Sequence, residues 1–508
     1  MPATGGALRF SRPQAAAARL GDLAVDRHRF ADKRVLLTGG IDELTTPNGA
    51  MLLLSSLRLL VRTTRRVTMS LPMGTDSIAA LDARCRTEAR RIAFASAPIG
   101  FDPTADPLMF DAVLSVGRSP HPGVPWTTVR SGGWLASVSS KGAPAPIPTR
   151  SWNPIGALGA AALGVTEVFR HLAIVSDRRA RVADGTPFSF YTYESGKLDA
   201  GPALPASIRA DGILVGCGAI GNGVVAALAE LPLTGRLAII DHQQFGEENL
   251  ATCMLIGEED VGRDKASTLA EFLPKSLTVV PFPGSIESYA ALVGDGREPH
   301  PPLIVNALDD EEARRRAQGL WPDLAIDGAI GGDFMAQVTR HPWGPDIACL
   351  RCMFPERTSE PAEILAARAS GLTPERTKQQ DDIVRQGDVD AAPANRRAAL
   401  QGAIGQRICS VVSAAVLAEI AARQPDETFE PSTAFVACLS SAMVAGELVK
   451  AACDWNSPLA PRFQLDALVG PQHGLFLPQS RRRECLCVTR SSAIDRYRAL
   501  VARSGIAR

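Results

Sequence analysis

The stretch Gly212–Lys265, which reads GILVGCGAIGNGVVAALAELPLTGRLAIIDHQQFGEENLATCMLIGEEDVGRDK, decides the fold of this chain. A short apolar run, Ile213–Val215, leads into three glycines in the spacing G-x-G-x-x-G, namely Gly216, Gly218 and Gly221. Glycines at this spacing let the backbone turn tightly and approach a phosphate group closely. The run and the glycines therefore predict a strand followed by a phosphate-binding turn.

The residues after the glycines complete the pattern. An Ala- and Val-rich helical segment runs to Leu231, and Arg236–Ile240 is a second apolar strand that ends in Asp241. The start of the helix offers unpaired N–H groups, and Asp241 can accept hydrogen bonds from ribose hydroxyls. We therefore predict a Rossmann-type unit that binds a nucleotide. The alternative is an empty or degenerate unit of the same fold.

Bulk composition narrows the classes of function. A chain of 508 residues should hold two to four packed units. Lys+Arg and Asp+Glu balance at 54 each, so no polyanion-binding surface and no nucleic-acid partner is expected. We find no basic, apolar leader and no uncharged run that would span a bilayer, and therefore expect a cytoplasmic protein without a membrane partner. In that compartment, closely spaced cysteines suggest a metal before a disulfide.

The two halves of the chain follow a similar plan, which indicates two α/β domains. Strands and helices of the first half have counterparts in the second: Val35–Leu37 and Ile213–Val215, Phe110–Val116 and Leu303–Ala307, Asn153–Leu172 and Phe435–Ala452. Only the second half has the three-glycine spacing. An accidental likeness between two ordinary α/β domains is the alternative.

The expected boundaries follow from composition. They are a first domain at 1–185, a hairpin and linker at 186–210, a second domain at 211–488, and a tail at 489–508. Within the second domain, a polar stretch at about 355–406 is longer than an ordinary connection and is expected to be a crossover loop. The tail is either an amphipathic helix or a disordered basic end.

Four residues near the glycine turn point to chemistry on ATP. They are Asn249, Lys265, Asp309 at the end of the strand LIVNALD, and Arg314. A lysine can neutralise phosphate oxygens, and a carboxylate at the carboxyl end of a strand can hold Mg²⁺. An NAD(P) oxidoreductase needs neither of these groups here. The bland alternatives are a solvated helix charge for Lys265 and a helix cap for Asp309.

Two tight cysteine pairs predict a metal site. Cys349 and Cys352 form CLRC, and Cys485 and Cys487 form CLC. Four thiolates fit tetrahedral Zn²⁺, and a closed four-sulfur shell is structural rather than catalytic. Such a zinc would tie the end of the chain back to residue 350. The alternative is two unrelated pairs of free thiols.

Together, these motifs resemble the ThiF/MoeB/ubiquitin-activating superfamily over about Asp211–Cys487, with a weaker echo in residues 8–175. The resemblance is to a bacterial activating enzyme for a ubiquitin-like modifier, with an inactive and an active adenylation domain fused into one monomeric pseudodimer. It implies ATP and Mg²⁺ as cofactors. It also implies adenylation of the C-terminal glycine of a ubiquitin-like protein, capture of the acyl group as a thioester, and transfer to a conjugating enzyme.

The resemblance also implies roles for individual residues. The matching positions are Gly216, Gly218 and Gly221 in the phosphate loop, Asp241 for ribose, Asn249, Lys265 for phosphate, and Asp309 for Mg²⁺. The chain departs from the family at Thr252 and Cys253, where the family has Arg-Gln, so a phosphate-contacting arginine is missing.

Three further residues take roles by the same resemblance. Arg12, in RFSRPQ, matches the arginine that the inactive half donates to the active site, although a solvated arm charge is the alternative. Cys409 is the preferred thioester cysteine, because a thiol at a helix start has a lowered pKa. Cys438 is the second choice, and a merely buried cysteine is the alternative for Cys409.

Two other functional classes stay open at this point. One is a sulfur-carrier adenylyltransferase of the thiamin or molybdopterin type, which needs no thioester. The other is a non-catalytic nucleotide-bound scaffold, which the missing arginine at Thr252 makes conceivable.

Overall fold

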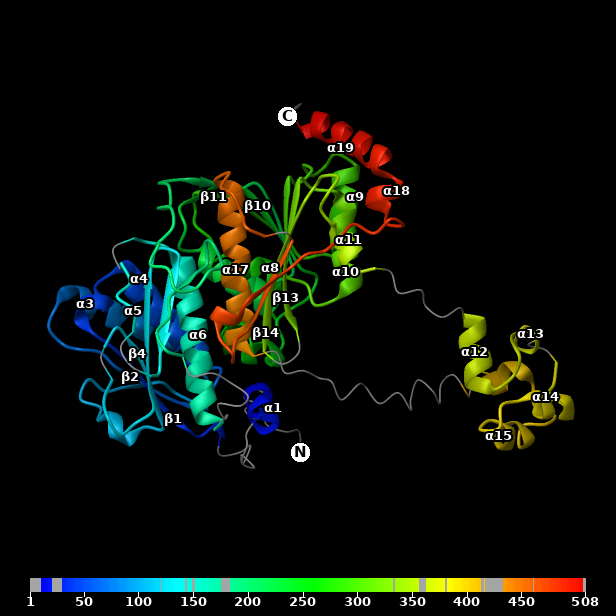
Figure 1. Ribbon diagram of the computed structural model, residues 1–508, viewed down its shortest axis with the longest axis horizontal. Helices are drawn as coiled ribbons and strands as arrows, with labels where there is room; N and C mark the ends of the chain where they lie inside the picture. Colours follow the sequence, from blue (N-terminus) through cyan, green and yellow to red (C-terminus); the bar gives the residue numbers. More distant parts are fainter. Residues whose placement is uncertain are drawn as a thin grey trace. The chain divides into compact units, whose positions relative to one another are not determined.

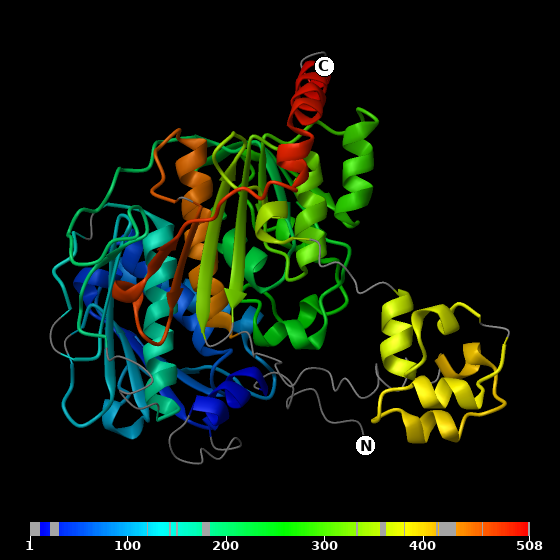
Figure 2. The same cartoon turned by 45° about the vertical axis from the view of Figure 1, so that its right-hand side comes forward.

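The computed structural model describes residues 11–20, 30–118, 120–141, 144–148, 151–174, 183–331, 334–355, 362–379, 382–412, 415, 433–459 and 461–505. The chain divides into two compact units, one of Met1–Phe354 with Pro431–Arg508 and one of Pro355–Glu430. The first unit holds two β-sheets, which Figures 1 and 2 show with their covering helices.

The first sheet has seven strands in the order β3-β2-β1-β4-β5-β6-β7. β1 to β5 pair in parallel, and β6 and β7 are antiparallel. The central strands are buried on both faces, so they are almost continuously apolar. The strands are β1 (Arg34–Gly39), β2 (Arg66–Ser70), β3 (Gly100–Phe101), β4 (Ala112–Val116), β5 (Trp126–Gly132), β6 (Leu135–Ser139) and β7 (Phe188–Ser189).

Two capped helices, α4 (Pro47–Leu60) and α6 (Pro154–Leu172), pack on this sheet, and a third, α5 (Asp76–Ile92), packs on α4. The side chains of Thr46, Thr75 and Asn153 accept backbone N–H groups at the respective helix starts, as N-cap residues do. The short helices α1 (Ser11–Leu20) and α3 (Ile41–Leu44) lie earlier in the chain.

The second sheet has nine strands in the order β11-β10-β9-β12-β13-β14-β15-β16, with β8 paired to β10. β8 to β13 pair in parallel, and β14 to β16 are antiparallel. The strands are β8 (Ile208–Arg209), β9 (Gly212–Val215), β10 (Leu233–Ile240), β11 (Leu277–Phe282), β12 (Leu303–Asn306), β13 (Leu324–Gly331), β14 (Met335–Pro342), β15 (Arg462–Asp466) and β16 (Leu475–Leu477).

The two sheets share one plan. The order β2-β1-β4-β5-β6 in the first sheet corresponds to β10-β9-β12-β13-β14 in the second, and in both the last strand of this run is antiparallel. The predicted α/β class, with two parallel-dominated sheets, is confirmed. The main helices of this half are α7 (Ala219–Leu228), α8 (Lys265–Ala270), α9 (Ile286–Gly294), α10 (Glu311–Ala317) and α17 (Ala434–Ala452).

α17 is the helix at the junction of the two sheets. It packs against α6 of the first half and α7 of the second, and Figure 1 shows it in orange beside α6. By length and composition α17 could cross a membrane, but 94% of its apolar window is buried in the fold. Its burial and its packing on α6 and α7 make α17 the central core helix.

A buried polar network anchors α17. Lys450 Nζ donates to Glu447 Oε1 at 2.7 Å, and the Tyr193 hydroxyl donates to the same oxygen at 2.8 Å. Arg340 of β14 lies 3.3 Å from Glu447 Oε2. The network joins α17 to β14 and to the tight turn after β7.

The second unit is helical where it is described. Its helices are α12 (Ala362–Ser370), α13 (Pro374–Thr377), α14 (Gln386–Ala391) and α15 (Arg397–Gln401), and its own apolar core includes Leu372, Val384, Leu400 and Ile408. The stretch expected as a crossover loop at 355–406 therefore carries these short helices; its residues 356–361 and 380–381 lie outside the described part. In the first unit, the tail forms α18 (Leu486–Thr489) and α19 (Ser491–Gly505), the helical one of the two alternatives.

Candidate active site

The glycine turn joins β9 to α7. Gly216 has φ +94°, and a Cβ there would lie 2.6 Å from the carbonyl oxygen of Ala307. A Cβ at Gly221 would overlap the carbonyl oxygen of Gly216. At Gly218, the N-cap of α7, a Cβ would meet no atom within 4 Å. The turn thus needs two of its glycines for its own shape, and the third leaves an open face at the helix start, where a phosphate fits.

Asp241, directly after β10, is bound to this turn. Its Oδ2 accepts the N–H of Cys217 at 2.7 Å, and its Oδ1 accepts the N–H of Gln243 at 2.8 Å. The Gln243 side chain accepts Lys265 Nζ at 2.7 Å. Gln243, which the sequence analysis did not single out, therefore links the predicted ribose acid to the predicted phosphate lysine.

The charge of Lys265 also acts on a residue of the glycine turn, Cys217. Burial raises the pKa of the Cys217 thiol well above its ordinary value, Asp241 acts in the same direction, and Lys265 acts against both. Lys265 begins α8 and is 5% exposed. The structure thus brings Asp241 and Lys265 to one turn.

Asn249 lies on a short 3₁₀ helix, Glu247–Ala251, and its Oδ1 accepts the Gly246 N–H at 2.9 Å. The next loop is pinned to α7, because the Leu255 N–H donates to Asn222 Oδ1 at 2.7 Å. Thr252, which stands where the family has arginine, is 4% exposed. The loop after Asn249 is therefore a packed wall of the site.

Asp309 lies three residues after β12, which ends at Asn306 rather than at Asp309 as expected. The Ala307 N–H donates to Val215 at 2.8 Å, so this segment runs beside the start of the glycine turn. Asp309 is exposed and, among the described residues, forms no hydrogen bond or ion pair. Its carboxylate is thus open to a cation at the carboxyl edge of the sheet.

Arg314 is a buried structural residue and not an exposed candidate for binding phosphate. It is buried on α10 and donates to the carbonyl oxygen of Leu308 at 3.1 Å and to that of Gly328 at 3.3 Å. Its Nε lies 3.2 Å from Asp327 Oδ1. Burial raises the pKa of Asp327 to about 7, and Arg314 opposes that shift. Arg314 therefore fixes the backbone before Asp309.

Arg12 reaches the same wall from α1, in the first half. Burial lowers the pKa of its guanidinium, and the neighbouring Cys253 and Glu248 act against that shift. Both neighbours flank the Asn249 loop in sequence. Arg12, on α1 of the first half, therefore interacts electrostatically with the two residues that flank the Asn249 loop.

The four paired cysteines come together. Their sulfur atoms all lie within 4.8 Å of one another, with separations of 3.7 Å for Cys349 and Cys485 and 3.4 Å for Cys352 and Cys487. Zn–S bonds of about 2.3 Å in a tetrahedron put the sulfurs about 3.8 Å apart. The donor set fits a structural zinc, and Trp321, Trp343 and Tyr497 pack around it.

The candidate thioester cysteines differ in accessibility. Cys409 is half-buried in the first turn of the helical residues 408–412, in the second unit. Cys438 is 1% exposed on α17, and burial raises the pKa of its thiol. Burial also raises the pKa of Cys253 to about 11. Of the two candidates, only Cys409 has the accessibility of a nucleophile.

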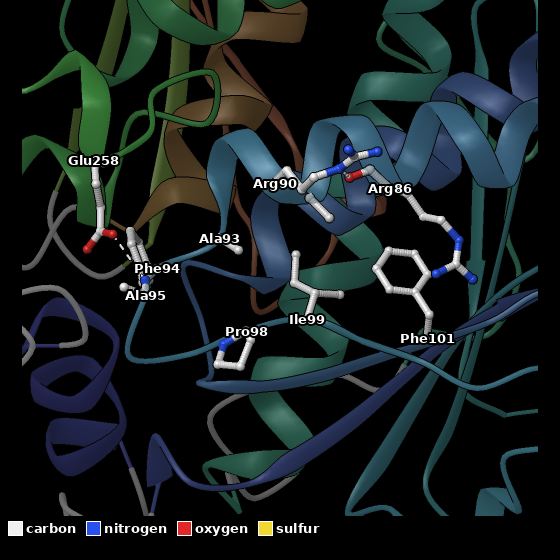
Figure 3. Close-up of a pocket in the computed structure, with 10 residues that line it drawn as sticks. Arg86, Arg90, Ala93, Phe94, Ala95, Pro98, Ile99, Phe101 and Glu258 are labelled. Carbon is white, nitrogen blue, oxygen red and sulfur yellow. Dashed lines mark hydrogen bonds between the residues drawn. The ribbon is translucent and has the colours of Figure 1, made fainter.

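A cavity of about 650 Å³ lies apart from all these residues, at the seam between α5 and the second half (Figure 3). Its wall includes Arg86, Phe94, Phe101 and Glu258, and the Ala95 N–H donates to Glu258 Oε2 at 3.0 Å. None of the predicted site residues lines it.

The fold and the glycine-turn constellation define a Rossmann-like nucleotide-binding protein. The profile of the ThiF family matches residues 208–487, more than half of the 508 residues. The chain therefore belongs to the ThiF family, a family of adenylyltransferases, and the predicted superfamily resemblance is confirmed. Residues 34–182 match the BilD N-terminal domain, which covers most of the first sheet.

The individual relatives share less than a third of their aligned residues with this chain. The chain is 29% identical over 373 residues to the uncharacterized protein y4jF of Sinorhizobium fredii, covering 69% of each chain. It is similar to the crystal structure of E. coli MccB with AMPCPP and MccA, at 18% identity and a TM-score of 0.36, covering 55% of this chain and 66% of that one. The E. coli MccB structure with ATP gives 18% identity and a TM-score of 0.34, covering 55% and 67%.

Proposed function

We propose that this protein activates the C-terminal glycine of a ubiquitin-like protein in two steps, adenylation with ATP and capture as a thioester on Cys409. A conjugating enzyme then receives the modifier by transthiolation. The observation that carries the proposal is the gathering of Asp241, Lys265 and the strand end before Asp309 around one glycine turn, in a chain of the ThiF family.

The first step is a displacement at phosphorus. A carboxylate oxygen of the modifier forms a bond to the α-phosphorus of ATP, and the bond to the pyrophosphate oxygen breaks. The N–H groups at the start of α7 and the ammonium of Lys265 face the phosphates and neutralise their charge, and Asp241 orients the ribose. Asp309 would hold Mg²⁺, which when bound supplies further charge neutralisation at the phosphates.

The second step uses the thiol. The Cys409 thiolate, its proton lost to solvent, attacks the acyl carbon, the bond to the AMP oxygen breaks, and AMP leaves. Support for Cys409 is its partial exposure at a helix start and its place on a separate helical unit with its own core. The buried Cys438 offers no comparable access.

Support for a fused, single-site pseudodimer comes from the shared strand plan of the two sheets. The first half lacks the three-glycine spacing, and it supplies Arg12 beside the Asn249 loop. In the proposal, Arg12 adds the positive charge that Thr252 does not provide.

The test is incubation of the full chain with ATP, Mg²⁺ and a labelled ubiquitin-like protein that ends in glycine. An adduct sensitive to reducing agent, retained in Cys438→Ser and lost in Cys409→Ala, is the expected result. Formation of the adenylate alone would instead support sulfur-carrier activation. No adenylate and no adduct, with nucleotide bound, would support the scaffold and overturn the proposal.

A further inference from the structure

We infer that Arg62, supported by Arg91, is a positioning residue: from the first half it holds residues 253–256 of the second half in the shape that the ATP site requires. The inference rests on the proposed function. It gives the first half a second task besides supplying Arg12.

Arg62 follows α4 and is 1% exposed. Its Nε donates to the carbonyl oxygen of Cys253 at 3.1 Å, and one terminal nitrogen donates to that of Ile256 at 2.6 Å. The other terminal nitrogen donates to the backbone carbonyl oxygen of Arg58, in the same half of the chain, at 3.1 Å. One guanidinium thus bridges the C-terminal end of α4 and two carbonyl groups about 190 residues away in sequence, at separations of 191 and 194.

The same loop is gripped by further groups of the first half. An Arg91 nitrogen of α5 donates to the carbonyl oxygen of Leu255. A Cβ at Gly257 would overlap the carbonyl oxygen of Arg91, so the two backbones touch there. One residue later, Glu258 accepts the Ala95 N–H, the dashed contact in Figure 3. The first half therefore contacts Cys253 and each of the four consecutive residues Leu255–Glu258.

On its other side the loop is tied to the glycine turn. Asn222 follows Gly221 directly, is fully buried, and accepts the Leu255 N–H at 2.7 Å. Leu255 is thus held through its N–H by the phosphate-loop helix and through its carbonyl by Arg91. A displacement of the loop must pull on α7, on which the proposed phosphate contacts depend.

The charge state suits the role. Burial lowers the pKa of Arg62 to about 9, so the guanidinium stays protonated at neutral pH. Removing it would leave the carbonyl groups of Cys253 and Ile256 buried without these donors, which a lysine satisfies only in part, since it has no planar fork.

The test compares Arg62→Lys and Arg91→Met with a matched control, Arg84→Met. Arg84 is also on α5 and also crosses to the second half, but its partner is Glu230, outside the loop, at 2.5 Å. Hydrogen exchange of residues 249–257 and the kinetic constants of ATP–pyrophosphate exchange are measured in the full chain. Arg91, which is partly exposed, keeps the test usable if Arg62→Lys does not fold.

In both test variants we expect loop exchange to accelerate at least about fivefold and KM for ATP to rise at least about fivefold, with kcat changed less. The Arg84→Met control should change neither. Loop exchange equal to wild type in a folded Arg91→Met chain would overturn the inference. If the wild-type chain shows no ATP–pyrophosphate exchange, the proposed function fails. The hydrogen exchange of residues 249–257 still decides whether these arginines hold the loop.

Discussion

Replacing Lys450 by methionine should destabilise the larger unit strongly, because it removes the nearest positive charge from a buried carboxylate. Lys450 and Glu447 are both fully buried, and their ion pair measures 2.7 Å. Methionine keeps the packing volume but removes the positive charge. Breaking a buried pair by removing one partner costs about 3–5 kcal/mol. Arg340 and the Tyr193 hydroxyl still contact Glu447, so the low end, about 3 kcal/mol, is expected.

The double variant Glu447→Gln with Lys450→Met separates this charge effect from packing. Glu447→Gln alone leaves an ammonium group facing an amide oxygen and the Tyr193 ring at 4.3 Å, and should cost about 2 kcal/mol. The double variant removes both members of the buried pair and keeps an acceptor for Tyr193 and for Arg340, so it should also cost about 2 kcal/mol. The coupling free energy between the two positions is then about 3 kcal/mol.

Urea unfolding followed by tryptophan fluorescence measures these costs, because the buried Trp134 lies 5.9 Å from Lys450 Nζ. Burial acts to raise the pKa of Glu447, but Lys450 and Arg340 outweigh it and hold the pKa below its ordinary value. The contribution of this group is therefore present above pH about 4.5 and lost as pH falls below that. Additive single costs, or a double variant with the same acid sensitivity as wild type, would show that Lys450 and Glu447 are not coupled.

Three further outcomes follow from the described contacts. The purified protein should carry about one zinc per chain. Cys352→Ser should lose the zinc and unfold at a lower temperature, whereas the control Cys453→Ser, outside the cluster, should retain it. A wild-type protein without metal would contradict the zinc site. Gly221→Ala should lower the free energy of unfolding by about 1–3 kcal/mol and weaken ATP binding, because its Cβ would overlap the Gly216 carbonyl. Gly294→Ala is the control, because its Cβ would meet no atom within 4 Å. Equal effects of the two substitutions in unfolding and titration calorimetry would contradict this geometry. The pKa of Asp327 is raised, so its contribution to stability falls as pH rises from about 4 to about 7. Across that range, the unfolding free energy of Asp327→Asn should increase by up to about 4 kcal/mol relative to that of wild type. A difference that does not change with pH would contradict the raised pKa.

Local patterns predicted much of the fold. The glycine spacing, the strand LIVNA and the two long apolar helices have their counterparts in β9, β12, α6 and α17, because these elements carry their burial pattern in consecutive residues. Strand ends were less accurate: β12 ends at Asn306, since Asp309 and Asp310 lead into α10, which Asp310 caps. The helices within 355–406 were missed because a small helical unit with few apolar residues reads as a polar loop.

The candidate site could be predicted only where one segment carries it. Asp241 and Lys265 lie close to the glycines in sequence, so motif spacing found them. Arg62 and Arg91 come from the other half, and neither LRLLVRTTRR around Arg62 nor TEARRIAF around Arg91 distinguishes a buried bridging arginine from a solvated one. Gln243 has no motif of its own. The one indication in the sequence is its position two residues after Asp241, in the segment that leads to Lys265.

The most direct test of the central claim is ATP–pyrophosphate exchange driven by a ubiquitin-like protein that ends in glycine, measured for wild type, Lys265→Ala, Asp309→Ala and Cys409→Ala. We expect exchange that requires the modifier, falls about 10²- to 10³-fold in Lys265→Ala and Asp309→Ala, and persists in Cys409→Ala. Exchange that is absent from the wild-type protein, or undiminished without Lys265 and Asp309, would contradict it.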